Sequence, residues 1–167
     1  MGIRRQTGLT LIEIMIALAI LAILSAVAIP LYEGYIGEAR IGTVLQDIRQ
    51  AELILDDLAL DNDLAAVEPA GYTGGASLGV YRNNSGIEFA AAAPAGTQPW
   101  LDPWGNIYRY ERPPVRTDAG GGLSNDSALP QGYDLYSSGP DGVAENGDDI
   151  IRGCNGEFVG TAGAHSC

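Results

Sequence analysis

The stretch Leu9–Pro30, LTLIEIMIALAILAILSAVAIP, decides how the chain is organised. Its only polar residues are Thr10, Glu13 and Ser25. As an α-helix, the apolar run would span about 31 Å, which matches the hydrocarbon core of a bilayer. The sequence therefore predicts a membrane helix over residues 9–30.

The charges that precede this helix predict its orientation. Met1–Gly8 carries Arg4 and Arg5 and no acidic residue. Because positively charged flanks stay on the cytoplasmic side, we expect the N-terminus to remain in the cytoplasm while the rest of the chain crosses the membrane.

An ordinary secretory signal peptide is the alternative for this segment. Ala26–Ala28 satisfies the A-x-A pattern at which such peptides are cleaved. Two features favour a retained helix: the apolar run is longer than the usual signal-peptide core, and Glu13 lies within it. A carboxylate at that place costs on the order of 3 kcal/mol to insert, which indicates a functional acid that pairs with a cation.

The composition of the 167-residue chain argues against several function classes. It has 21 acidic and nine basic residues, the latter all arginine, for a net charge of −12. Nucleic-acid binding needs clustered basic side chains, so it is not expected here. One histidine, His165, and two cysteines leave little material for a transition-metal site or a catalytic triad.

The residues after Pro30 predict that the helix continues as an amphipathic stem over residues 31–61. Apolar residues recur there at three- and four-residue spacing: Ile41, Val44, Leu45, Ile48, Ala51, Leu55 and Leu58. Charged side chains take much of the remaining surface. We expect the protein's own β-sheet to cover the apolar stripe, and Pro30 to kink or loosen the helix.

Residues 62–167 predict a small globular head. Residues 62–98 resemble a long connection with one short strand around Leu78–Arg82, while Gly105–Glu111 and Tyr133–Ser137 have the pattern of strands. Three or four short strands need the stem helix as a core partner. The predicted fold class is therefore α+β, a long N-terminal α-helix packed against a small antiparallel β-sheet.

The segment Gly8–Met15, GLTLIEIM, resembles the class III prepilin signature of type IV pilins and type II secretion pseudopilins. The resemblance implies a pilin-like fold and a leader peptide of residues 1–8. In that family a prepilin peptidase cuts after the glycine and methylates the new amine. Carried over, cleavage falls between Gly8 and Leu9, with N-methylation of Leu9. Pro30 also stands where the family commonly has proline.

The same resemblance implies a role for Glu13 in assembly. In the family this glutamate is thought to meet the N-terminal amine of a neighbouring subunit. Because an unpaired buried charge is costly, adding a subunit would relieve that cost. The implied partners are further copies in a helical filament, an inner-membrane assembly platform and minor pseudopilins.

The segment Asp102–Tyr108, DPWGNIY, is the first of two motifs in the head. Pro103 predicts a turn, Trp104 a large buried anchor, and Gly105 an unusual backbone angle before a strand. The segment resembles the DPWGNPY motif of the major pseudopilins of type II secretion.

The second motif follows the strand at Tyr133–Ser137 and holds four acids: Asp141, Glu145, Asp148 and Asp149. Their spacing is equally consistent with a solvated acidic turn and with a calcium loop, since Ca²⁺ draws six to eight oxygens from flexible loops. The segment is similar to the calcium-binding loop of major pseudopilins. That resemblance implies a structural Ca²⁺ held by the carboxylates of Asp141, Asp148 and Asp149 and the backbone carbonyls of Ser138, Val143 and Asn146.

Two cysteines, Cys154 and Cys167, lie near the C-terminus. In an oxidising periplasm we expect them to form a disulfide, which would contribute about 3 kcal/mol. A C-terminal disulfide loop is common in type IV pilins, so this feature favours that branch.

The leading hypothesis is a structural filament subunit, the major pseudopilin of a type II secretion system, in the inner membrane and the periplasm. The alternative is a type IV pilus subunit at the cell surface, serving adhesion, motility or DNA uptake. A more distant alternative is a membrane-anchored periplasmic enzyme that uses Asp148 and Asp149 as acid and base. The first two hypotheses involve no catalysis.

Overall fold

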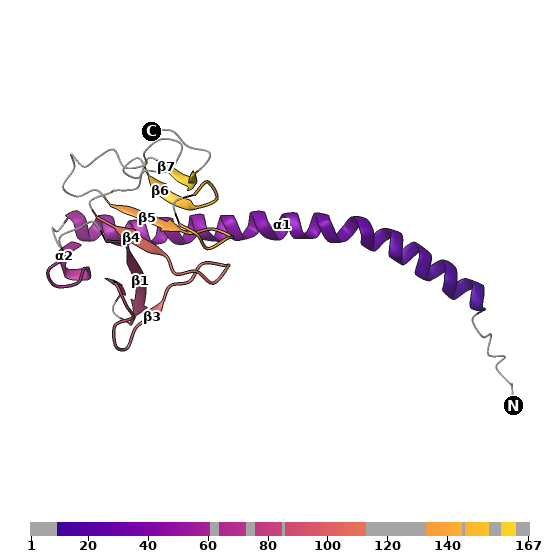
Figure 1. The fold of residues 1–167 in the computed structure, drawn as a ribbon, viewed down its shortest axis with the longest axis horizontal. Coiled ribbons are helices and arrows are strands. Elements are labelled where there is room, and N and C mark those ends of the chain that lie inside the picture. Colours follow the sequence, from indigo (N-terminus) through magenta and orange to yellow (C-terminus); the bar gives the residue numbers. More distant parts are fainter. Residues whose placement is uncertain are drawn as a thin grey trace, which may run out of the picture. The chain divides into compact units, whose positions relative to one another are not determined.

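The structure, a computed structural model, describes residues 10–60, 64–72, 76–84, 86–112, 133–144, 146–153 and 158–162. Its elements are α1 (Leu11–Leu60), α2 (Leu64–Val67), β1 (Leu78–Asn83), β2 (Gly86–Ala90), β3 (Gln98–Pro99), β4 (Arg109–Glu111), β5 (Asp134–Ser137), β6 (Ile150–Gly153) and β7 (Phe158–Thr161) (Figure 1). The chain divides into two compact units, residues 1–39 and residues 40–167.

The helix predicted in two halves is one continuous element, α1. Pro30 lies inside it and does not end it, although its ring removes one backbone donor. The predicted long N-terminal helix is therefore confirmed, with helical backbone on both sides of the proline.

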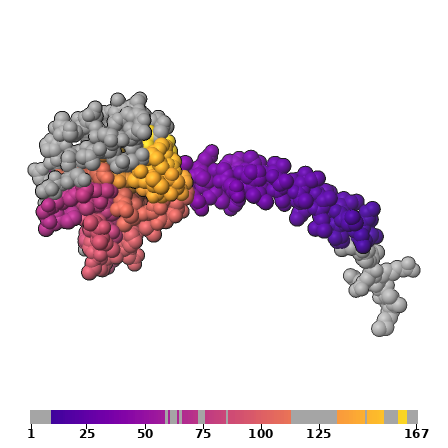
Figure 2. Space-filling model, viewed as in Figure 1, coloured from indigo at the N-terminus to yellow at the C-terminus, as the bar shows by residue number. Residues whose placement is uncertain are grey.

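The part of α1 in the first unit carries its large apolar side chains on the outside. The exposed ones are Leu11, Ile12, Ile14, Met15, Ile16, Leu18, Ile20, Leu21, Ile23, Leu24, Val27, Ile29, Leu31, Tyr32 and Tyr35. They form much of the indigo surface in Figure 2. The helix is long and apolar enough to cross a membrane, and its apolar window has no side chain buried inside the protein.

The strands of the second unit form one antiparallel sheet in the order β2-β1-β4-β5-β6-β7, with β3 paired to β1. The described residues contain seven strands, so the expected three or four were too few. The missed strands have only two to five residues, and the alternation of buried and less buried side chains in GIEFA of β2 covers just five positions. Such segments become strands through their partners rather than through local pattern.

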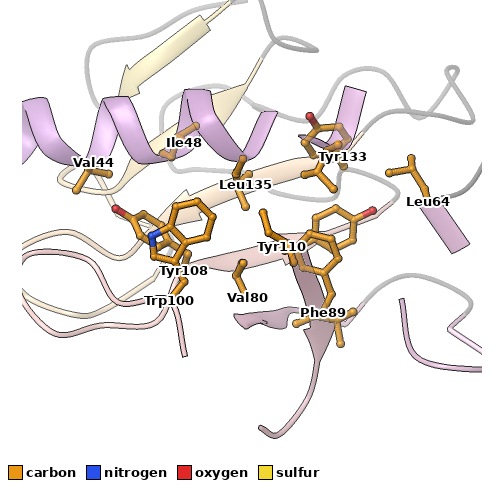
Figure 3. Packing of buried hydrophobic residues seen from close by; sticks show 14 of the residues in the cluster. Val44, Ile48, Leu64, Val80, Phe89, Trp100, Tyr108, Tyr110, Tyr133 and Leu135 are labelled. Atoms are coloured by element: carbon orange, nitrogen blue, oxygen red, sulfur yellow. The ribbon is translucent and has the colours of Figure 1, made fainter. Parts of the chain in front are cut away.

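The core lies between the sheet and the stem part of α1 (Figure 3). Val44, Ile48, Ala51 and Leu55 are buried there, so the predicted apolar stripe is confirmed and the sheet covers it. Aromatic side chains from the strands and from the segments next to them fill the other half: the Phe89 and Tyr110 rings stack at 3.9 Å, and Trp100 meets Tyr108 edge to face at 5.6 Å. Leu64 of α2 closes one end.

The prediction that Trp104 is a buried anchor overestimates the burial of its side chain. Trp104 is only partly buried and packs against the core from its edge, whereas Trp100 is buried at 6% exposure. The backbone explains the difference, because Trp104 stands at the tip of a turn and Trp100 precedes it in an extended segment that bonds to Val80 and Tyr108.

Three tyrosines reach from the strands and their flanks to carboxylates outside the sheet. Tyr108 donates its hydroxyl to Asp47 at 2.9 Å and Tyr133 donates to Asp56 at 3.0 Å. Tyr110 donates to Glu68 at 2.7 Å. Burial raises the pKa of each of these tyrosines, so each hydroxyl stays protonated and remains a donor.

A buried arginine joins β6 to the stem. Arg152 is 5% exposed and its Nε donates to Glu52 Oε1 at 2.9 Å, while Nη1 donates to the carbonyl of Tyr133 at 3.1 Å. Its guanidinium also lies over the Tyr133 ring, 4.1 Å from the centroid. Glu52 is therefore part of the helix–sheet junction and not of a solvated face.

We predict that Arg152→Met lowers the free energy of unfolding by about 3–5 kcal/mol, because it leaves the Glu52 carboxylate buried without its main cation. Urea unfolding of the full chain in detergent, followed by the fluorescence of Trp100 and Trp104, measures this. Arg49→Met is the matched control. It removes a half-exposed arginine that also binds Glu52, and it should cost about 1 kcal/mol or less. Equal losses in both variants would contradict the importance of the buried pair.

Candidate functional site

The residues between β5 and β6, Ser138–Asp149, form the acidic loop. Ser137 and Ile150 are register partners in the β5–β6 pair, so the two ends of the loop lie side by side. The loop opens with the turn Gly139–Gly142, in which both glycines have positive φ, 62° and 71°. Glycine suits these angles because it has no Cβ to clash.

The structure brings four of the predicted ligand residues together: Asp141, Val143, Asn146 and Asp148. Asn146 Nδ2 donates to Asp141 Oδ2 at 2.8 Å, and the backbone N–H of Asp148 donates to Asn146 Oδ1 at 3.2 Å. Val143 donates its backbone N–H to Asp141 Oδ1 at 2.8 Å. Asn146 was expected to contribute its backbone carbonyl, whereas here its side chain links the two aspartates.

The aspartate pair at the end of the loop is divided between two environments. Asp149 is fully buried and its carbonyl accepts a hydrogen bond from the backbone of Ala162 at 2.8 Å, while Asp148 is half-buried. Within the described part of the chain, one carboxylate oxygen of Asp149, Oδ1, has no hydrogen-bond partner, although the residue has other interactions. A buried carboxylate at a loop end needs electrostatic compensation nearby.

The oxygen atoms that the acidic loop offers as metal ligands are of the types that bind hard cations. They are carboxylate, amide and backbone carbonyl oxygens, which Ca²⁺ prefers. Among the described residues, however, no three carboxylate, imidazole or thiolate groups stand close enough together to hold a metal ion. A cation in this loop would therefore depend on backbone carbonyls as well as on acids, as the predicted ligand set also requires. Ser138, one of the expected carbonyl donors, is buried where the loop begins.

The turn Asp102–Asn106, which we call the support turn, contacts the start of the acidic loop. Asp102 Oδ1 accepts the backbone N–H groups of Trp104 at 3.0 Å and Asn106 at 2.8 Å. Asn106 Nδ2 donates to the carbonyl of Gly139 at 2.9 Å. Sequence reasoning identified the turn but missed Asp102 and Asn106 as contact residues. An aspartate that precedes a proline turn is a typical Asx-turn signal and could have pointed to Asp102.

Glu13 has a local role that the sequence reasoning missed. Its Oε2 accepts both the backbone N–H and the hydroxyl of Thr10, each at 2.8 Å, and Thr10 Oγ1 accepts the N–H of Glu13 at 3.4 Å. This is a capping box at the start of α1, and the T-x-x-E spacing of the sequence is its signature. Thr10 and Glu13 therefore satisfy donors at the N-terminal end of the helix that would otherwise have no partner.

Four predicted residues lie outside the part of the chain that the structure describes. They are the cleavage-site residues Gly8 and Leu9 and the cysteines Cys154 and Cys167. Glu145 of the acidic loop lies outside it as well. Cleavage, N-methylation and the disulfide thus stay predictions.

Comparison with known proteins finds relatives along nearly the whole chain. Residues 3–29 match the family described as "Prokaryotic N-terminal methylation motif". The chain is 30% identical to the type II secretion system core protein G of Pseudomonas aeruginosa over 159 residues, which cover 87% of this chain and 91% of that protein. It is also 30% identical to the core protein G of Klebsiella pneumoniae over 150 residues, with 88% and 94% covered.

The match to fimbrial proteins is shorter. A type IV major fimbrial protein FimA of Dichelobacter nodosus is 39% identical over 69 residues, which cover 41% of this chain and 44% of that protein. No solved structure matches the chain. The long alignments with core protein G extend through the head, beyond the N-terminal segment. The chain therefore belongs to the family of type II secretion system core protein G, among the type IV pilin-like proteins.

Proposed function

We propose that this protein is the major pseudopilin of a type II secretion system, a structural filament subunit that polymerises through its N-terminal helix to push folded exoproteins across the outer membrane. The observation that carries the proposal is the 30% identity with two core proteins G over 87% or more of this chain. The role is structural, and no catalytic step is assigned to Asp148 and Asp149, which lie in different environments.

The surface of α1 supports assembly through this helix. Its apolar side chains are exposed in the single chain, with Leu11 at 78% and Ile23 at 68%. A bilayer would cover them before assembly, and neighbouring copies of the helix would cover them in a filament. A continuous apolar helix can therefore serve first as a membrane anchor and then as the core of the filament.

The N-terminal residues support an inner-membrane origin with the head in the periplasm. Arg4 and Arg5 precede the helix and favour a cytoplasmic N-terminus. A prepilin peptidase would cut between Gly8 and Leu9 and methylate Leu9, as the match to the N-terminal methylation motif supports. The inner-membrane assembly platform and minor pseudopilins would be the further partners.

Glu13 would guide the addition of subunits. Cleavage creates an amine at Leu9, and the carboxylate of Glu13 in a neighbouring copy is a suitable partner in a low-dielectric environment. Within its own chain, Glu13 already binds Thr10 through Oε2. The capping box thus holds the carboxylate at the start of α1, where an incoming amine can meet it.

A type IV pilus subunit is the second candidate. The 39% identity with a FimA protein favours it, but that match covers only 41% of this chain. The predicted disulfide between Cys154 and Cys167 also favours this branch.

A structural Ca²⁺ in the acidic loop is part of the proposal. Asp141, Asp148 and Asp149 would contribute carboxylates, and the carbonyls of Ser138, Val143 and Asn146 would complete the set. Its support is the oxygen-only donor set, the full burial of Asp149, and the hydrogen bonds that hold Asp141 and Asn146 together. The bound ion would compensate the acidic charge of the loop and stabilise the end of the sheet.

We predict that the protein recovered from membranes begins with N-methylated Leu9, because the glycine and the glutamate of the signature stand at the required spacing. Intact mass and N-terminal sequencing measure this. Gly8→Val, which alters the cleavage position, should leave the leader attached, whereas Gly2→Val should be processed normally. A mature chain that begins at Ile29 would contradict the proposal, since it would lack the membrane helix.

We predict that Glu13→Gln abolishes assembly while leaving membrane insertion intact. Glutamine preserves the capping box, so the change removes only the charge. In a deletion strain complemented with the variant, filaments and exoprotein secretion should each fall by at least about tenfold. Thr10→Val removes the capping hydroxyl and keeps the charge, and it should have the smaller effect. Normal secretion combined with lost surface pili would instead favour the type IV pilus.

We predict that EDTA lowers the melting temperature of the full chain in detergent by about 5–10 °C relative to millimolar Ca²⁺. A shift of this size is expected when the Ca²⁺ concentration is about 100 times the Kd. Asp141→Asn should remove most of this difference. Asp57→Asn, which neutralises an exposed acid on α1, should retain it. Identical melts with Ca²⁺ and with EDTA would contradict the calcium proposal without affecting the filament proposal.

A further inference from the structure

The support turn Asp102–Asn106 and the acidic loop meet because of how two strands pair. β4 and β5 run antiparallel, with Arg109 opposite Tyr136 and Glu111 opposite Asp134. The support turn leads into β4, and the acidic loop leaves β5, so both lie at the same end of the sheet. Residues more than 30 positions apart in the sequence thereby come into contact.

Asp102 connects the support turn to the last residue of β5. It is 5% exposed, and its Oδ2 accepts the hydroxyl of Ser137 at 2.6 Å. The Ser137 hydroxyl oxygen in turn accepts the backbone N–H of Gly139 at 3.1 Å. Since Oδ1 of Asp102 binds two N–H groups of its own turn, this one carboxylate fixes both the turn and the direction in which the loop leaves the strand.

Asn106 contacts both glycines of the turn that opens the acidic loop. Its Nδ2 donates to the Gly139 carbonyl at 2.9 Å and to Asp102 Oδ2 at 3.3 Å. A Cβ on Gly142 would lie 2.9 Å from Asn106 Oδ1. Both ends of the Gly139–Gly142 turn are thus held against this one side chain.

The contact continues from Gly139 to the aspartate pair. A Cβ on Gly139 would lie 2.4 Å from the backbone oxygen of Asp148, so the two backbones touch. Gly139 is therefore the only residue between the side-chain amide of Asn106 and the backbone of Asp148. A shift of Gly139 would move Asp148 and, through the Asn146 hydrogen bond, Asp141 as well.

We infer that the support turn holds the acidic loop in the conformation that binds a cation. Asn106 is the positioning residue, because its side chain fixes the loop backbone. The turn holds the loop backbone before an ion arrives, so less ordering is required on binding. The expected effect on cation affinity rests on the proposed Ca²⁺ site. The expected effect on the backbone order of the acidic loop does not depend on it.

The test is Asn106→Ala in the full chain in detergent, with Asn84→Ala as the matched control in the turn between β1 and β2. Backbone hydrogen exchange of residues 138–149 without Ca²⁺ should accelerate about tenfold or more in Asn106→Ala and stay unchanged in the control. Calcium affinity by isothermal titration should weaken about 10- to 100-fold, the usual effect of losing a residue that orients ligands.

Four outcomes decide the inference. Faster exchange confined to the loop, with weakened affinity, supports it. Unchanged exchange and affinity overturn it, and so does faster exchange spread evenly over the sheet, because that indicates a general loss of stability. If the wild-type chain takes up no Ca²⁺, the calcium proposal fails, and loop exchange alone then decides whether Asn106 orders the loop.

Discussion

The burial of one helical stripe by short strands is the constraint on which the rest of the structure depends. Strands of two to six residues bury too little apolar surface to be stable on their own, and Val44, Ile48, Ala51 and Leu55 supply the missing half of the core. The helix that provides this stripe is the same continuous α1 that carries the exposed apolar segment. The sheet therefore folds on a helix whose other half is suited to a membrane or a filament.

The packing of the sheet on the stem also brings charged side chains into the helix–sheet junction. The chain is strongly acidic, yet several of its acids serve structural roles beside the apolar stripe. Asp47 and Asp56 accept tyrosine hydroxyls, and Glu52 binds the buried Arg152. Because burial raises the pKa of Tyr108 and Tyr133, their hydroxyls stay protonated and remain donors over the physiological pH range. Each one joins the stem to the β4–β6 side of the sheet.

Antiparallel pairing also decides where the functional features lie. The β4–β5 pair places the support turn beside the acidic loop, and the β5–β6 pair brings the ends of that loop together. Arg152 is the third residue of β6, which follows the loop, and it binds the stem through Glu52. The acidic loop thus has a fixed attachment on each side, Asn106 at its start and the β6–stem contact at its end. A loop held in this way can gather oxygen ligands with little loss of conformational freedom.

The sequence by itself determined the features that depend on neighbouring residues. These include the apolar helix, its amphipathic continuation, the strand β4 at Arg109–Glu111 as part of the predicted strand Gly105–Glu111, and the turn that needs Gly105 at positive φ. Periodicity and turn chemistry are local, so one chain was enough to predict them. The β2, β3, β6 and β7 strands, the partners of Asp102 and Asn106, and the burial of Asp149 rather than Asp148 were decided only by the tertiary structure. They depend on contacts such as Glu52 with Arg152, 100 residues apart, and no local pattern encodes which distant segments pair.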